Sequence, residues 1–177
     1  MLGRTHIVCG CFAGVVAVQL GAPMNVIGFI SVLAGSLAPD IDTRGYISTP
    51  GRFFPFLPKI LRELLNVLGL TINFIIRMFT RHRGLTHAPL LCMLILALSI
   101  RYGSYYGVLF SLGFFSHLFL DLLTEEGIPV FYPFSKKSLS LQVTHTGSSL
   151  EEIFYWTFLI LFLFLGFETL SLYQYIQ

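Results

Sequence analysis

Apolar residues are gathered into five long runs, at residues 7–20, 26–38, 88–100, 105–123 and 153–170. The last two runs are long enough to cross a bilayer as helices. Each of the first three supplies about 20 Å of helix, whereas the hydrocarbon core is roughly 30 Å thick. We still predict membrane helices there, which borrow flanking residues or thin the bilayer. The pattern therefore predicts an all-α membrane bundle of about five membrane helices.

The first two runs are joined by Gly21, Ala22 and Pro23, which is typical of a tight helical hairpin. Gly10 and Gly14 form a GxxxG pair, which allows two helices to approach closely. A secretory signal peptide is the alternative interpretation of this N-terminal region. The second apolar run follows at once, and this favours the hairpin.

The segment Lys59–Phe79 has a different pattern, because basic and polar residues alternate with Leu and Ile at helical spacing. Such a helix is typical of the membrane interface, where one side is basic and the other apolar. We therefore expect a single membrane domain over 1–177, with a surface loop and an interfacial helix inserted at 45–80. A second loop, at 124–150, is expected on the cytoplasmic side.

The composition supports a membrane protein, because 55% of the residues are hydrophobic and only 11% are charged. A soluble domain carries about 25% charged residues, so the sequence argues against a soluble enzyme and a nucleic-acid-binding domain. If Lys59–Phe79 does not cross the membrane, the basic residues divide ten to one between its two faces. The basic face holds Arg4, Arg44, Arg52, Lys59, Arg62, Arg77, Arg81, Arg83, Lys136 and Lys137, and the other face holds Arg101.

This asymmetry places the basic face in the cytoplasm. The N-terminus is then cytoplasmic, and the C-terminus is periplasmic or extracellular. If Lys59–Phe79 crosses instead, the later charges change sides and the asymmetry largely disappears.

Candidate metal ligands gather at the ends of the apolar runs, near the same basic face. They are His6, Asp40, Asp42, His82, His87, His117 and Asp121. His117 and Asp121 are four residues apart, so they share a helix face. Asp40 and Asp42 follow Pro39, in a loop where their carboxylates can converge. His82 and His87 are five positions apart, and Thr86 is positioned to cap the helix that begins near His87.

The number and type of these residues point to a divalent metal. Carboxylates at the edge of a bilayer are costly unless they are paired, and metal together with imidazole satisfies them. A tetrahedral zinc site with one open position needs three protein ligands, so seven candidates suggest two ions. Such metals supply a hydroxide nucleophile near neutral pH. Arg83 is placed to orient a phosphate or to pair with Asp40 or Asp42.

Four motifs together resemble the YdjM-type family, which is described as inner-membrane, metal-dependent hydrolases, some of them labelled LexA-binding. The motifs are Thr5-His6, Pro39-Asp40-Ile41-Asp42, His82-Arg83-Gly84-Leu85-Thr86-His87 and His117-x-x-x-Asp121, and Thr124, Gly127 and Tyr132-Pro133-Phe134 match the continuation. The resemblance covers residues 5–134 and departs most at 45–79. It implies a bacterial inner-membrane protein and a divalent metal.

Our first hypothesis is a membrane-embedded hydrolase with one or two metal ions, zinc being favoured over manganese or magnesium. It acts on a phosphoester of a lipid or lipid-linked substrate at the cytoplasmic interface. Asp42, Arg83 and His87 are its expected catalytic residues. The expected partners are membrane lipids, and no direct binding of nucleic acid is expected.

Two alternatives remain at this point. One is a membrane scaffold or regulator with a structural metal and a protein partner, and the other is a small metal transporter. The sequence also does not choose a general base among the glutamates. The candidates are Glu125, Glu126, Glu151 and Glu152. His145 is expected to be a lone, solvent-facing loop histidine.

Overall fold

The computed structural model describes the chain except for residues 24, 43–50, 52–54, 80–83 and 177. The side chains of residues 42, 75–79, 170 and 172–176 also lie outside the description. Over the described ranges the protein is all-helical and has no named strand, as predicted. The helices are α1 (Gly3–Gln19), α2 (Val26–Leu37), α3 (Lys59–Phe79), α4 (Pro89–Arg101), α5 (Tyr105–Leu122) and α6 (Ser149–Ile176), with the 3₁₀ turns η1 (Ala38–Asp42) and η3 (Leu85–His87).

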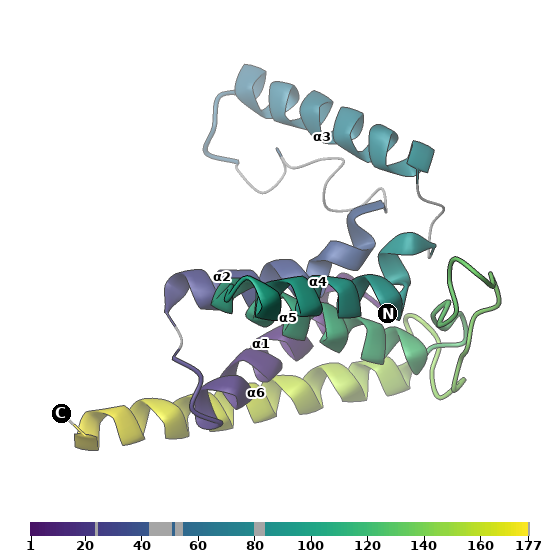
Figure 1. Cartoon of the computed structure of the whole chain (residues 1–177). Coiled ribbons are helices and arrows are strands. Elements are labelled where there is room, and N and C mark those ends of the chain that lie inside the picture. The colour runs from purple at the N-terminus through teal and green to yellow at the C-terminus, as the bar shows by residue number, and fades with distance from the viewer. Residues whose placement is uncertain (24, 43–50, 52–54, 80–83, 177) are drawn as a thin grey trace.

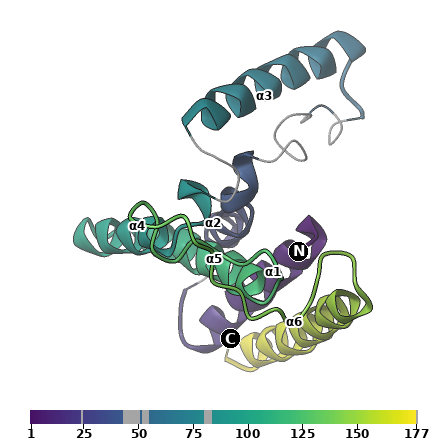
Figure 2. The same cartoon turned by 90° about the vertical axis from the view of Figure 1, so that its right-hand side faces the viewer.

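Helix α5 is the centre of the bundle, because it contacts α1, α2 and α4, while α6 packs against α1. Successive bundle helices alternate in direction (Figure 1). Consequently α1, α4 and α6 begin at the end of the molecule where α2 and α5 finish. The same end carries η1, η3 and the N-terminus, as the view in Figure 2 also shows.

The surface of the bundle is strongly apolar. Two segments, Tyr105–Leu122 and Ser149–Thr169, are long and apolar enough to cross a membrane, and Val26–Ile41 and Pro89–Arg101 are shorter apolar helices. Along α6, large side chains such as Phe167 are mostly exposed in the isolated chain. Such a surface suits contact with hydrocarbon rather than water. The figure of about five spans remains a prediction.

Helix α3 forms over the range that the sequence pattern predicted. It lies apart from the other helices in both views (Figures 1 and 2) and contacts η1. The amide of Asn73 donates a hydrogen bond to the carbonyl oxygen of Ile41, at 3.0 Å, and so links α3 to η1. The exposed side chains of α3 include Ile60, Leu64 and Phe74. The expected position of α3 at the membrane interface remains a prediction. The predicted loop at 45–58 lies mostly outside the described residues.

Two glycines allow α2 and α5 to touch through their backbones. A Cβ atom on Gly35 would lie 2.0 Å from the carbonyl oxygen of Phe110, and one on Gly113 would lie 1.9 Å from that of Val32. Both distances are far shorter than any van der Waals contact. Close approach through small residues is the usual way in which helices associate in membranes, where no hydrophobic effect drives them together.

The predicted GxxxG pair is only partly involved in such contacts. A Cβ on Gly10 would lie 2.7 Å from the side chain of Ser36, so Gly10 does bring α1 close to α2. A Cβ on Gly14 would meet Phe29 at an ordinary 3.6 Å.

Replacing Gly113 with Ala should therefore destabilise the bundle, because the added methyl group must push α2 away from α5. We expect the free energy of unfolding to fall by about 1–3 kcal/mol, the usual cost of overpacking. Denaturant or thermal unfolding in detergent micelles measures this change. Gly166→Ala in α6 is the matched control, because a Cβ there meets nothing within 4 Å. An equal stability loss in both variants would contradict the prediction.

Candidate metal centre

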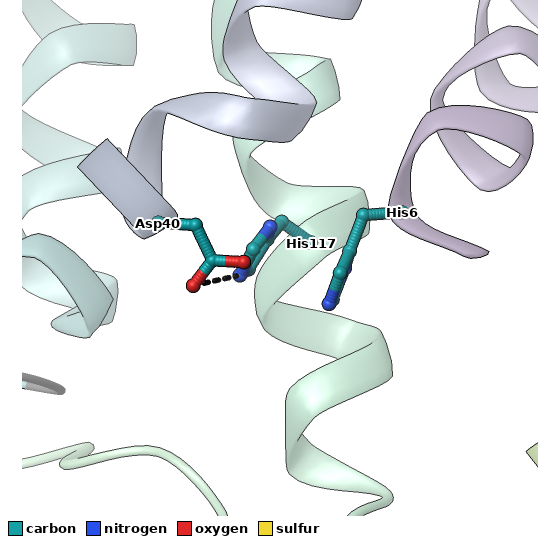
Figure 3. A group of neighbouring side chains, drawn as sticks. All are labelled: His6, Asp40 and His117. Carbon is teal, nitrogen blue, oxygen red and sulfur yellow. Dashed lines mark ion pairs between the residues drawn. The ribbon is translucent and has the colours of Figure 1, made fainter. Parts of the chain in front are cut away.

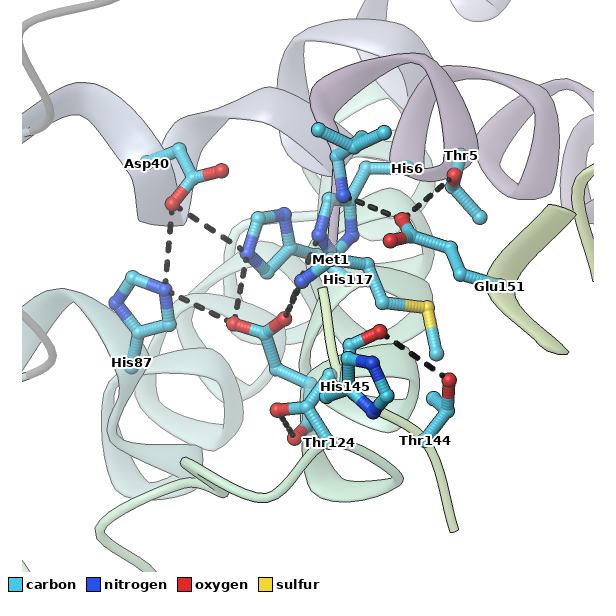
Figure 4. A network of polar contacts seen from close by, with 12 residues as sticks. Met1, Thr5, His6, Asp40, His87, His117, Thr124, Thr144, His145 and Glu151 are labelled. Carbon is cyan, nitrogen blue, oxygen red and sulfur yellow. Dashed lines mark hydrogen bonds and ion pairs between the residues drawn. The ribbon is translucent and has the colours of Figure 1, made fainter. Parts of the chain in front are cut away.

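Five of the seven predicted ligands converge at the end of the bundle where α2 and α5 finish (Figures 3 and 4). They come from four separate segments of the chain, namely α1, η1, η3 and α5. The five are His6, Asp40, His87, His117 and Asp121. The positions fit the alternating topology, because each lies near a helix end at the same face of the molecule.

His117 is held in one orientation by the backbone of α2. Its Nδ1 lies 2.8 Å from the carbonyl oxygen of Ser36, which can only accept, so Nδ1 carries the hydrogen. The lone pair of Nε2 then faces Asp121 Oδ2 at 3.5 Å and Asp40 Oδ1 at 3.9 Å. This buried Nε2 has no hydrogen-bond partner among the described residues. Such a lone pair repels the carboxylate oxygens unless a proton or a metal cation lies between them.

His87 approaches the same two carboxylates from η3. Its Nε2 lies 3.3 Å from Asp121 Oδ2 and 3.5 Å from Asp40 Oδ1. The hydroxyl of Thr86 lies 3.2 Å from the His87 Nδ1 and orients the ring. The expectation that Thr86 caps the next helix is therefore wrong. Helix α4 begins at Pro89 after the N-cap residue Ala88, without a side-chain cap, because proline at the first position removes one of the N–H groups that a cap would satisfy.

His6 completes the cluster from α1. Its ring stacks on that of His117 with 3.7 Å between ring centroids and an interplanar angle of 12°. Its Nε2 lies 3.4 Å from Asp121 Oδ1. Neither ring nitrogen of His6 has a hydrogen-bond partner in the described part of the chain. A fully buried imidazole in this state is costly unless an ion or a proton occupies the site.

The spacing of these atoms fits a metal better than a hydrogen-bond network. The four shortest imidazole–carboxylate contacts measure 3.3 to 3.5 Å, whereas N–H···O hydrogen bonds cluster at about 2.7–3.2 Å. Two ligands of a tetrahedral zinc ion, with bonds of about 2.0–2.2 Å, lie about 3.3–3.6 Å apart. Imidazole and carboxylate are also ligands that zinc prefers. The donor set therefore fits a divalent metal ion.

The ligand atoms form two overlapping groups. One consists of His6, Asp40 and His117, and the other of His87, His117 and Asp121, with the atoms of each within 4.8 Å of one another. His117 belongs to both groups but has only Nε2 available, because Nδ1 is bound to Ser36. It can therefore ligate one ion at a time.

Burial and charge together shape the protonation of this cluster. Asp40 is partly exposed, and the other four residues are at most 1% exposed. Burial alone would raise the pKa of Asp40, but the bond to His87 and the charges of His117 and His6 outweigh it and hold the pKa at about 2. Burial alone would lower the pKa of His87, but Asp121 and Asp40 outweigh it and raise the pKa. Both shifts arise from the attraction between the carboxylates and the positive charge of protonated imidazoles.

Glu151, which the sequence offered only as one of four candidate general bases, supports the centre from α6. Its side chain is 1% exposed and accepts hydrogen bonds from the backbone N–H of Leu2, the hydroxyl of Thr5 at 3.0 Å, and the N–H of Gly147 at 2.6 Å. Thr5 precedes the ligand His6, so Glu151 fixes the start of α1. The spacing Ser148-x-x-Glu151, typical of a helix N-terminus, was the available signal. The Met1 amine adds a further contact, at 2.9 Å from Asp121 Oδ1.

The remaining predicted residues either lie outside the described part of the chain or are exposed. His82, Arg83 and the side chain of Asp42 lie outside the described residues. His145, Glu125 and Glu126 are exposed in the loop between α5 and α6. The hydroxyl of Thr144 donates a hydrogen bond to the backbone carbonyl oxygen of the next residue, His145, at 3.4 Å (Figure 4).

Comparison with known proteins agrees with this arrangement. No curated protein and no solved structure matches the chain. The family model described as YdjM inner membrane protein matches residues 1–175, which is nearly the whole chain. The matched region includes all five clustered residues and the apolar helices that carry them. The chain therefore belongs to the YdjM inner membrane protein family.

Proposed function

We propose that this protein is a membrane-embedded, metal-dependent hydrolase that acts on a phosphoester of a lipid or lipid-linked substrate. The observation that carries the proposal is the buried Nε2 of His117, whose lone pair faces two carboxylates. His6, Asp40, His87, His117 and Asp121 would hold one or two ions, zinc being favoured over manganese or magnesium. A zinc ion in such a site lowers the pKa of water to about 7 and polarises a phosphoryl oxygen.

The residues around the ion have distinct tasks in this proposal. Ser36 and Thr86 hold the rings of His117 and His87 in place through Nδ1. Asp40 lies at the surface side of the cluster, since it is 19% exposed, and a substrate reaches the site past it. The proposed catalytic residues are Asp42, Arg83 and His87, as their motifs suggest. Arg83 would orient the phosphate of the substrate.

The choice of a lipid substrate rests on location. In an inner-membrane protein, a site at the ends of the membrane helices meets lipid headgroups first. Arg4, Lys136 and Lys137 lie at this end, and Arg101 ends α4 at the other, which favours the cytoplasm for the site. The N-terminus is then cytoplasmic, the C-terminus is periplasmic or extracellular, and about five helices cross the membrane.

A second candidate is a membrane scaffold or regulator whose metal is structural and whose basic face binds a protein partner. The burial of four of the five ligands favours it, because structural metal sites are closed by the protein. The partial exposure of Asp40 favours the enzyme.

The decisive experiment combines metal analysis with a substrate panel. The protein is purified in detergent, its metal is measured by inductively coupled plasma mass spectrometry, and phosphate release is followed on phosphatidic acid, phosphatidylglycerol phosphate and polyprenyl pyrophosphate. We expect about one or two zinc ions per chain and turnover of at least one lipid. His117→Ala should lose both, whereas His145→Ala, which changes an exposed histidine, should lose neither. Bound metal without turnover of any ester would leave the scaffold as the function.

A further inference from the structure

An apolar groove of about 440 Å³ runs between α4 and α5. Its lining is almost entirely hydrocarbon, from side chains such as Met93, Leu96 and Leu112. Volumes of 300–1,000 Å³ are typical of ligand pockets. The groove is separate from the metal-ligand cluster, whose side chains do not line it.

The few polar atoms in this lining are already satisfied within the protein. The hydroxyl of Ser111 donates to the carbonyl oxygen of Gly107 at 2.9 Å. The thiol of Cys92 donates to the carbonyl oxygen of Ser111 at 3.6 Å. An occupant therefore finds no free hydrogen-bonding group here, so the groove suits an alkyl chain and not a headgroup.

One end of the groove lies level with the metal centre. Its lining residues there are Pro89, Leu118 and Leu122, which are close neighbours in sequence of the ligands at 87, 117 and 121. From Val108 to Leu122 the groove follows α5 for about 21 Å at 1.5 Å per residue. One leaflet of hydrocarbon is about 15 Å deep. An alkyl chain that starts at the metal centre therefore finds a groove that is longer than one leaflet is deep.

The groove is continuous with the lipid-facing surface of this inner-membrane protein. Its rim includes Met93 and Phe115, which are 64% and 61% exposed in the isolated chain. At the site end, Ile128 lines the groove and exchanges backbone hydrogen bonds with Leu139, both at 2.9 Å. The loop between these two residues carries the exposed Lys136 and Lys137. Positive charge at the groove's site end complements an anionic headgroup.

We propose that the groove between α4 and α5 binds one acyl chain of an anionic phospholipid, whose phosphate then lies at the metal centre. This inference rests on the proposed function for its substrate class and adds the binding site of the substrate's tail. The groove then favours phosphoesters that carry an alkyl chain over water-soluble ones, because only the former can fill it.

The test uses the full chain in phosphatidylcholine nanodiscs that contain a trace of phosphatidic acid with a diazirine at the end of one acyl chain. After irradiation, the adducts are mapped by peptide mass spectrometry. We expect adducts on α4 and α5 to exceed those on α6 at least tenfold. Leu112→Trp, which fills the groove, should remove this excess. Leu163→Trp, on the exposed face of α6, should leave it unchanged.

A second variant tests the groove without filling its middle. Val108 lines the end that is remote from the site, so Val108→Trp shortens the groove. It should abolish labelling by a probe with a long chain and spare one with a chain of eight carbons. An unchanged circular dichroism spectrum shows that each variant is folded.

Several outcomes would overturn this inference. They are adducts spread evenly over α4, α5 and α6, full labelling of folded Leu112→Trp, and a second copy of the chain cross-linked into the groove. Labelling needs no turnover, so the two proposals fail separately. Groove labelling without hydrolysis overturns the enzyme, and hydrolysis without groove labelling overturns the acyl-chain site.

Discussion

Replacing Asp121 with Asn is expected to empty the metal centre while the helical fold remains. Asp121 places one oxygen 3.4 Å from His6 and the other 3.3 and 3.5 Å from His87 and His117. Asparagine keeps the shape but loses the charge, and its NH₂ group cannot ligate a cation. We expect metal affinity to fall by more than about 100-fold, beyond the 10–100-fold that follows loss of an outer-shell partner.

Metal content after purification and zinc titration by calorimetry measure this change. Glu125→Gln is the matched control, because it neutralises an exposed carboxylate that follows shortly after Asp121 in the chain. Circular dichroism confirms that both variants retain their helices. Full metal content in folded Asp121→Asn would show that the cluster does not hold the ion as proposed.

Replacing Glu151 with Ala is expected to cause the largest loss of stability. The substitution leaves the N–H groups of Leu2 and Gly147 and the hydroxyl of Thr5 without their acceptor. The Thr5 hydroxyl is buried, so leaving it unsatisfied costs about 1–3 kcal/mol, and the two part-buried N–H groups lose bonds to a charged acceptor. The free energy of unfolding should therefore fall by at least about 2 kcal/mol. Zinc affinity should fall as well, because the start of α1 carries His6.

Thermal unfolding in detergent tests this prediction, and the neighbouring residue supplies its control. Glu152 pairs with Arg4 at the surface, where both side chains are about half exposed. Glu152→Ala should therefore cost less than about 1 kcal/mol. Glu151→Gln retains an acceptor oxygen and should be intermediate. Similar losses in Glu151→Ala and Glu152→Ala would refute the special role of the buried carboxylate.

The sequence predicted the helices and most of the described metal cluster. Apolar runs define helices in membrane proteins well, because a lipid-exposed backbone must satisfy its own hydrogen bonds. The motif residues could be assigned to one face of the membrane because they end or precede these runs. Lys59–Phe79 was predictable from periodicity alone, although its partners were not.

The supporting contacts were not predictable from residue types. The Ser36 group that orients His117 is a backbone carbonyl, which every residue possesses. The contacts of Gly35 and Gly113 depend on the register between α2 and α5, and a single sequence does not specify that register. Glu151 looked like an ordinary acidic residue in a first helical turn, and its burial depends on where α1 begins.

The dispersal of the ligands along the chain has a consequence for biogenesis. His6 lies in α1, yet its partners His117 and Asp121 belong to α5, and Glu151, which anchors the start of α1, belongs to α6. A chain inserted helix by helix cannot assemble this pocket until α5 has been synthesised. The residues of the candidate metal centre therefore meet only late in the assembly of the bundle.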